Sequence, residues 1–175
     1  QSRGLGDVYK RQVCIQKSFF YSSLNAKELQ NYIELAEDQE FIRQTLPAKN
    51  LCAFIADGSI LPRESGISSR PMKASVPFTS PDSLRISINL PHKGKITGMG
   101  IPKGITLIVG GGYHGKSTLL NALELGVYNH IPGDGREYVI TDATAVKLRS
   151  EDGRFIKDVD ISMFINDLPN KKDTR

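Results

Sequence analysis

The sequence has no tryptophan, and its 175 residues include only two cysteines and three histidines. Cys14 and Cys52 are too few and too far apart to make a disulfide framework or a zinc site, which favours a reducing setting. His92, His114 and His130 lack the spacing of metal ligands, and we expect His92 and His130 to be ordinary surface or core residues. These shortages exclude small disulfide-bonded proteins and zinc-bound domains.

Long apolar runs are also missing. No stretch approaches the roughly 20 consecutive apolar residues that span a membrane, and no charged and then apolar signal peptide opens the chain. We therefore expect a cytoplasmic protein with no membrane partner. The length suits one domain of ordinary size.

The excess of positive charge is small. The net charge is +4, and residues 1–12 supply +2 of it, because Arg3, Lys10 and Arg11 outnumber Asp7. This opening, QSRGLGDVYKRQ, resembles translated adaptor sequence and shows no apolar periodicity, so we exclude it from the fold prediction. The charge that remains is weak support for a nucleic-acid partner.

What the sequence does contain is a phosphate-binding motif in the order that its chemistry requires. Residues 105–109 form a short apolar, β-branched run, which predicts a buried strand. Residues 110–117 fit the pattern G-x-x-x-x-G-K-[ST]. Apolar residues then recur at helical spacing, and Gly126 predicts the helix end. Strand, glycine loop and helix together predict a P-loop.

Each residue of the motif has a predicted role. The glycines let the backbone approach a ligand closely, and the loop N–H groups with the positive end of the helix form an anion cradle. Lys116 is the predicted catalytic residue, with its ammonium on the β- and γ-phosphates, and Ser117 offers its hydroxyl to Mg²⁺. His114 either contacts the γ-phosphate or a facing subunit, or it and Tyr113 use only their backbone N–H groups. The predicted nucleotide-binding residues are Gly110, Gly111, Gly112, Tyr113, His114, Gly115, Lys116, Ser117 and Thr118.

Residues 13–82 predict an N-terminal α/β region. Asn25 and Glu28 look like a capping box. The helix that they open runs to Ala36, and a second helical turn follows at residues 40–46. These helices either bind a partner or cover a core.

The later part of this region predicts a hairpin and then a connection. Residues 51–61 are two apolar runs joined by Asp57-Gly58, a hairpin signal. Residues 62–82 are rich in Pro and Ser and predict an extended connection with little regular structure. Its basic residues either hold the phosphates of a nucleotide or nucleic acid or belong to a solvated loop, because no aromatic residues interleave with them to stack bases. They are Arg63, Arg70 and Lys73.

Residues 83–175 predict the first half of a nucleotide-binding core. Two strands, the second broken by glycine, join the strand before the loop, so three antiparallel-looking strands lead into it. A Rossmann-like protein more usually carries the loop on its first strand. The elements expected here are strands at 84–90, 96–101, 105–109 and 137–141, a hairpin around Asp152-Gly153, and a helix at 161–165 capped by Asp160.

Residues 96–142 (ITGMGIPKGITLIVGGGYHGKSTLLNALELGVYNHIPGDGREYVITD) strongly resemble the predicted ATPases of the ABC class, a group of stand-alone soluble ABC-type P-loop ATPases. Residues 54–66 (FIADGSILPRESG) also resemble the N-terminal region of that family. GGGYHGKSTLL is the specific part, because ordinary ABC transporters more often carry a Ser-Gly-rich loop there. The resemblance covers only the family's N-terminal and phosphate-loop part.

The resemblance implies an α/β fold of the ABC type, with an antiparallel strand subdomain before the loop, and Mg²⁺-dependent ATP hydrolysis. It also implies a head-to-tail homodimer and suggests RNA or DNA as a partner. An ABC ATPase needs a second apolar strand ending in Asp-Glu, a signature segment and a switch His. The sequence lacks them, so we expect an incomplete fragment that is inactive alone.

Several assignments stay open. Asn166 or Asp167 is either the polar residue that senses Mg²⁺ and water or an ordinary residue, and Phe54 and Phe78 are both available to stack on adenine. Two other functions also stay open: a nucleotide-switched binding module for RNA or DNA, and a P-loop small-molecule kinase.

Overall fold

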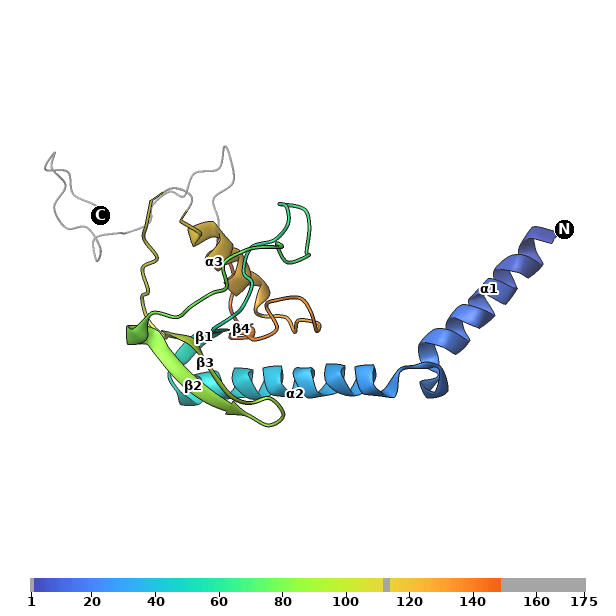
Figure 1. Cartoon of the computed structure of the whole chain (residues 1–175), viewed down its shortest axis with the longest axis horizontal. Helices are drawn as coiled ribbons and strands as arrows, with labels where there is room; N and C mark the ends of the chain where they lie inside the picture. Colours follow the sequence, from blue (N-terminus) through green and yellow to red (C-terminus); the bar gives the residue numbers. More distant parts are fainter. Residues whose placement is uncertain (1, 112–113, 149–175) are drawn as a thin grey trace, which may run out of the picture. The chain divides into compact units, whose positions relative to one another are not determined.

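The computed structural model describes residues 2–111 and 114–148, with side chains from residue 7 onward. The chain divides into two units, Gln1–Ala145 and Val146–Arg175, and the elements below belong to the first. Figure 1 labels α1 (Ser2–Phe19), α2 (Ala26–Ala48), β1 (Leu51–Ala56), β2 (Arg85–Leu90), β3 (Gly94–Pro102), α3 (Lys116–Leu125) and β4 (Val139–Thr141). Two short 3-10 helices, η1 (Tyr21–Ser23) and η2 (Asp82–Leu84), precede α2 and β2. No helix in this described part is long and apolar enough to cross a membrane.

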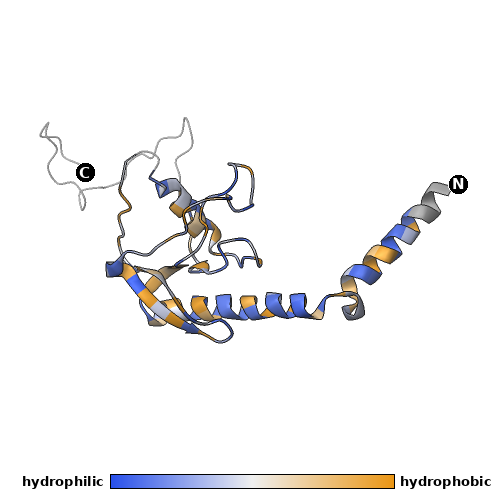
Figure 2. Ribbon diagram, viewed as in Figure 1, coloured by the Kyte–Doolittle hydropathy of each residue, from blue (hydrophilic) through white to orange (hydrophobic). Residues whose placement is uncertain are grey.

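The described strands form one sheet in the order β2-β3-β1-β4, and each neighbouring pair is antiparallel. Alternate residues of the central strand β1 enter two different cores, as the period of a strand requires. Phe54 packs with Ile42 and Leu46 of α2, whereas Ile55 packs with Ala122 of α3. The sheet therefore lies between α2 and α3, and Figure 2 shows its apolar strands beside the banded hydropathy of α2.

α2 is one continuous helix, where the sequence predicted a helix to Ala36 and a separate turn. The side-chain oxygen of Asn25 accepts hydrogen bonds from the backbone N–H groups of Lys27 and Glu28, so the predicted N-cap is confirmed. The two polar residues that interrupt the apolar period, Asp38 and Gln39, are buried and partnered, so they continue the helix. The inner face of α2 covers the core, which favours that interpretation over a partner-binding helix.

The predicted hairpin over residues 51–61 is wrong in its second strand. β1 ends at Ala56, and residues 59–61 form no strand. Both edges of β1 are already paired, with β3 on one side and β4 on the other. The turn at Asp57 and Gly58 therefore sends the chain off the sheet, where Ile60 N–H donates to the carbonyl of Gly135.

The strands predicted at 84–90 and 96–101 are confirmed as the β2-β3 hairpin, but β3 is not broken. Gly98 pairs with Ile86 on one side and Ala56 on the other. A Cβ on Gly98 would lie 2.3 Å from the carbonyl oxygen of Ile55 and 2.7 Å from Cζ of Phe54. The glycine thus allows a close approach between strands rather than ending one.

The strand predicted at 105–109 is not formed in this structure. These residues have no regular secondary structure, and the side chains of Ile105, Leu107 and Val109 are more than 70% exposed. An apolar run of this kind suits a strand buried on both faces, which needs neighbouring strands. None of the strands in the described ranges pairs with it.

The remaining predictions divide into confirmed and undescribed parts. The connection is confirmed as irregular, apart from an isolated bridge between Arg63 and Pro71. The strand predicted at 137–141 is β4, with shorter bounds. The hairpin around 152–153, the helix at 161–165, and Asn166 and Asp167 lie outside the described residues.

Residues 1–12 were excluded from the fold prediction, yet α1 covers most of them. Its side chains from Asp7 onward are exposed, except for half-buried Val13. The described side chains of α1, from Asp7 onward, therefore belong to neither apolar core. That residues 1–12 come from an adaptor stays a prediction.

Candidate phosphate-binding site

α3 is positioned by its far end, which is joined to β4. Thr141 donates its N–H to the carbonyl of Gly126 at 2.9 Å and its hydroxyl to the carbonyl of Leu123 at 2.7 Å. Ala122, on the same helix, is fully buried against the sheet. These contacts fix the axis of α3, and so they place its first turn at the end of the predicted phosphate loop.

The start of α3 has no side-chain cap. Gly115 is the N-cap residue in the left-handed conformation, with φ of +79°, and has no side chain to cap the helix. Leu119 N–H donates to the carbonyl of Gly115. The N–H groups of Lys116, Ser117 and Thr118 precede that first intrahelical bond, so they belong to the helix end that attracts anions.

Several polar groups of the described loop residues are bonded to one another. Lys116 Nζ donates to the carbonyl oxygens of Gly110 at 2.6 Å and Gly111 at 2.5 Å. The N–H of Gly111 donates to Nδ1 of His114 at 3.1 Å. The structure thus brings together two ends of the motif that are six residues apart in the sequence. Of the predicted nucleotide-binding residues, Gly112 and Tyr113 lie outside the described ranges.

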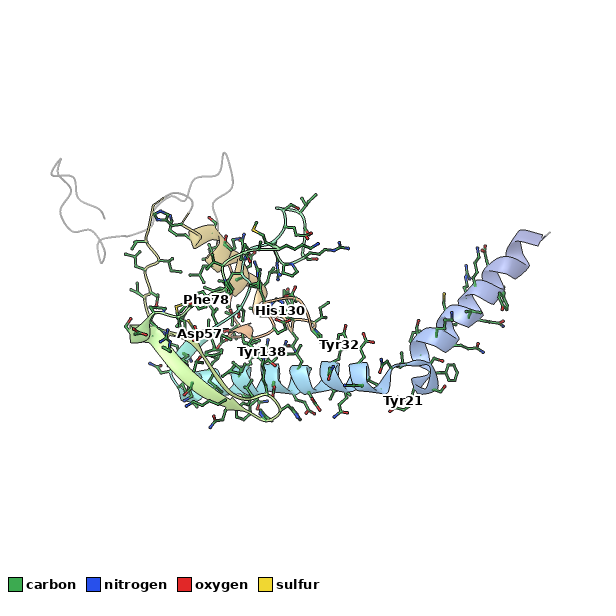
Figure 3. The ribbon with its side chains drawn as sticks, in the orientation of Figure 1. Tyr21, Tyr32, Asp57, Phe78, His130 and Tyr138 are labelled. Carbon is green, nitrogen blue, oxygen red and sulfur yellow. The ribbon has the colours of Figure 1, made fainter. Side chains whose placement is uncertain are left out.

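A cavity of about 600 Å³ opens beside this loop. One wall is formed by Lys116, Thr118 and Leu119, and the other by apolar residues of the connection. Those connection residues include Met72, Val76 and Phe78; Phe78 can be followed in Figure 3. The cavity is therefore mostly apolar, with a cation at one end.

The two phenylalanines offered for adenine stacking are separated by the structure. Phe54 is fully buried in the core between α2 and the sheet, so it cannot meet a ligand. Phe78 is half-buried and lines the cavity. Sequence reasoning missed Met72 and Val76, because an irregular Pro- and Ser-rich segment carries no periodicity that would show which of its side chains border a cavity, and both of these remain exposed.

The connection is held at both ends. At its start, the guanidinium of Arg136 donates from Nε to the carbonyl of Leu61 at 2.9 Å, and its Nη2 bonds the same oxygen. Burial, with the charge of Arg63 nearby, lowers the pKa of Arg136 to about 10, so it remains charged at neutral pH. The carbonyl of Leu61 thus has a permanent cationic partner.

At its other end, Asp57 binds Ser80. Its carboxylate accepts from the N–H of Ser80 at 2.6 Å, from the Ser80 hydroxyl at 2.7 Å and from the Thr97 hydroxyl at 2.9 Å. Burial raises the pKa of Asp57, but these hydrogen bonds and Arg85 outweigh it and lower the pKa overall. The cavity wall is therefore fixed to the end of β1.

His130 and Arg63 share one carboxylate partner, Asp134. His130 Nδ1 lies 2.7 Å from a carboxylate oxygen of Asp134, which also binds Arg63 at 2.9 Å. Arg63, one of the three cations offered for phosphate binding, is thus paired. Burial lowers the pKa of His130, and Asp134 offsets this only in part. Across the residues that the structure describes, no three His, Cys, Asp or Glu side chains gather as a metal cluster.

Comparison with known proteins shows to which protein family this glycine loop and helix belong. Residues 25–175 match the ABC_ATPase family, described as a P-loop domain. The chain belongs to that family, which confirms the resemblance seen in the sequence.

A similar protein is "Uncharacterized protein MJ1628" of Methanocaldococcus jannaschii, 35% identical over 140 residues. The alignment covers 75% of this chain and 31% of that relative. The chain therefore spans about a third of the length of the relative that it matches.

Proposed function

We propose that residues 110–118 bind ATP with Mg²⁺, and that the whole protein hydrolyses the ATP. The observation that supports this most is the position of Lys116: it opens α3, borders the cavity and reaches back to the carbonyls of Gly110 and Gly111. The first-turn N–H groups of α3 would hold phosphate oxygens, and Lys116 would turn from the carbonyls to the β- and γ-phosphates.

The base would enter the apolar cavity. Its volume of about 600 Å³ lies in the range of small-molecule sites, and the aromatic ring of Phe78 offers a face for stacking. Ser117 is exposed on the first turn of α3, and its hydroxyl oxygen is the kind of ligand that Mg²⁺ prefers. The residues present therefore fit the metal, which would neutralise phosphate charge when bound.

Hydrolysis, a head-to-tail homodimer and a cytoplasmic location are proposed on family grounds. We assign the residue that activates water to a part of the whole protein outside the described ranges. The described residues add no support for the two alternative functions, a nucleotide-switched module that binds RNA or DNA and a P-loop small-molecule kinase. Arg63 is occupied by Asp134, which removes one of the three cations behind the nucleic-acid hypothesis.

The binding proposal is tested with Lys116→Ala. We expect the affinity of the chain for ATP with Mg²⁺, measured by isothermal titration calorimetry, to fall at least tenfold, because a hydrogen bond to a charged group contributes about 1.5–3 kcal/mol. Lys95→Ala removes an exposed cation of β3 and serves as the matched control. Equal affinity in Lys116→Ala and Lys95→Ala would contradict the assignment.

The hydrolysis proposal is tested on a protein that is as long as the relative from Methanocaldococcus jannaschii. There, Lys116→Ala should abolish phosphate release from ATP, whereas Lys95→Ala should leave it unchanged. Undiminished turnover in Lys116→Ala would rule out this site as the hydrolytic one.

A further inference from the structure

The imidazole of His114 lies against Gly110 and Gly111. A Cβ built on Gly111 would lie 3.0 Å from Cε1 and 3.3 Å from Nδ1 of His114. A Cβ built on Gly110 would lie 3.7 Å from the same Nδ1. The ring therefore occupies the space that the two glycines leave free, on the side where the Gly111 N–H points.

The hydrogen bond sets the protonation of the ring. Gly111 N–H is a donor, so Nδ1 of His114 must be the unprotonated, accepting nitrogen. A phosphate oxygen accepts from a loop N–H in the same way. His114 thus makes, from within the chain, the contact that a phosphate would make on this amide.

Lys116 completes the arrangement from the other side of the same peptide. Its ammonium holds the carbonyls of Gly110 and Gly111, while His114 holds the N–H of Gly111. A ligand phosphate can use Gly111 N–H only after the imidazole leaves it. Binding is then an exchange, and the apparent affinity falls by the fraction of loops in which the contact is open.

We propose that His114 is a built-in substitute for phosphate, which accepts the Gly111 N–H and competes with the incoming nucleotide for it. The inference rests on the proposed function, because it requires that residues 110–118 bind nucleotide. It assigns the His114 side chain a role distinct from contact with the γ-phosphate or with a facing subunit.

The test compares three variants by calorimetric titration of the chain with ATP and Mg²⁺. His114→Ala removes the competing acceptor, so affinity should rise roughly two- to tenfold, the value of one net hydrogen bond. His114→Asn keeps an accepting oxygen near the position of Nδ1 and should stay close to the unaltered chain. His92→Ala, on the exposed turn between β2 and β3, is the control and should not change affinity.

Weaker or unchanged binding in His114→Ala would overturn the inference while leaving the proposed function intact. No ATP binding by the unaltered chain would overturn both. Imidazole ¹⁵N NMR gives an independent readout: Nδ1 of His114 should be unprotonated and hydrogen-bonded without nucleotide, and its signal should move when ATP is added. A protonated Nδ1 in the nucleotide-free chain would contradict the proposal whatever the affinities.

Discussion

Gly98 shows how a single residue sets the distance between two strands. Phe54, which is fully buried, extends its ring toward Gly98 across the β1-β3 pair, and a Cβ there would also lie 2.8 Å from Cα of Ala56. The sequence showed only a glycine in a strand, which was interpreted as a break. The partner that explains it lies more than forty residues earlier, so no local pattern could have revealed it.

Gly98→Ala should therefore destabilise the fold by about 1–3 kcal/mol, because an added methyl group has no room in a packed core. The free energy of unfolding in urea, followed by circular dichroism, measures the effect. Gly66→Ala is the matched control, since a Cβ there has no atom within 4 Å. Equal stability of the two variants would show that the strands separate without strain.

At the same scale, the spacing of the phosphate motif was informative because all its parts are local. Gly115, Lys116 and Ser117 stand where a loop meets a helix, as the pattern requires. The bond from Gly111 to His114 could not be foreseen, because the sequence left open whether the histidine side chain takes part at all.

Among the elements, α2 shows what periodicity predicts and what it misses. Its start was predicted from Asn25, a residue that acts on its immediate neighbours. Its middle was not, because Asp38 binds the N–H groups of His92 and Lys93, and Gln39 binds the carbonyls of His130 and Glu137. Buried polar groups with distant partners look, in a sequence, like an exposed break in the helix.

Asn25→Ala should cost about 0.5–2 kcal/mol of stability, because two backbone N–H groups at the start of α2 lose their acceptor. Urea unfolding and the helical signal at 222 nm measure the change. Asn31→Ala, at an exposed position inside the same helix, is the control and should be neutral or slightly stabilising, since Ala has the higher helix propensity. Equal losses of stability in Asn25→Ala and Asn31→Ala would contradict the assignment of Asn25 as a stabilising N-cap.

Residues 105–109 show that the pattern of a strand does not by itself form one. Their pattern matches a strand buried on both faces, but a strand is completed by its neighbours rather than by its own residues. The β2-β3 hairpin was predictable because each strand supplies the other's hydrogen bonds within one short turn.

At the scale of the molecule, part of the pH dependence of stability follows from His130 and Asp57, whose pKa values are lowered by folding. Burial lowers the pKa of His130, so the unfolded chain takes up a proton near pH 6.5 while the folded chain resists it. Stability is then full above about pH 6.5 and is lost as the pH falls below it. Asp57 acts in the same direction near pH 4, because its folded pKa is also lowered.

We therefore expect the urea concentration at the unfolding midpoint of the chain to decrease when the pH is lowered from 7.5 to 5.5. His130→Gln should show a smaller fall over this range, because it removes the group that titrates there. His92→Ala, in which an exposed histidine beside Glu37 is lost, serves as the comparison. A midpoint that rises on acidification, or an equal fall in His130→Gln, would contradict the assignment.

The molecule as a whole also shows why the connection was the hardest part to interpret. It is irregular, as predicted, but it is fixed by Arg136 and Asp57 and forms one wall of the cavity. Both anchors lie outside the connection itself, so composition alone suggested a loose linker where the structure has a defined surface.

One part of that connection indicates where the chain should tolerate insertions. The bridge between Arg63 and Pro71, with Glu64 N–H donating to the carbonyl of Arg70, closes off residues 64–70 as a separate excursion. Ile67 at its tip is fully exposed. Insertions and deletions there would leave the cavity wall in place. We therefore expect insertions to be tolerated better between positions 64 and 70 than from Pro71 to Ser80.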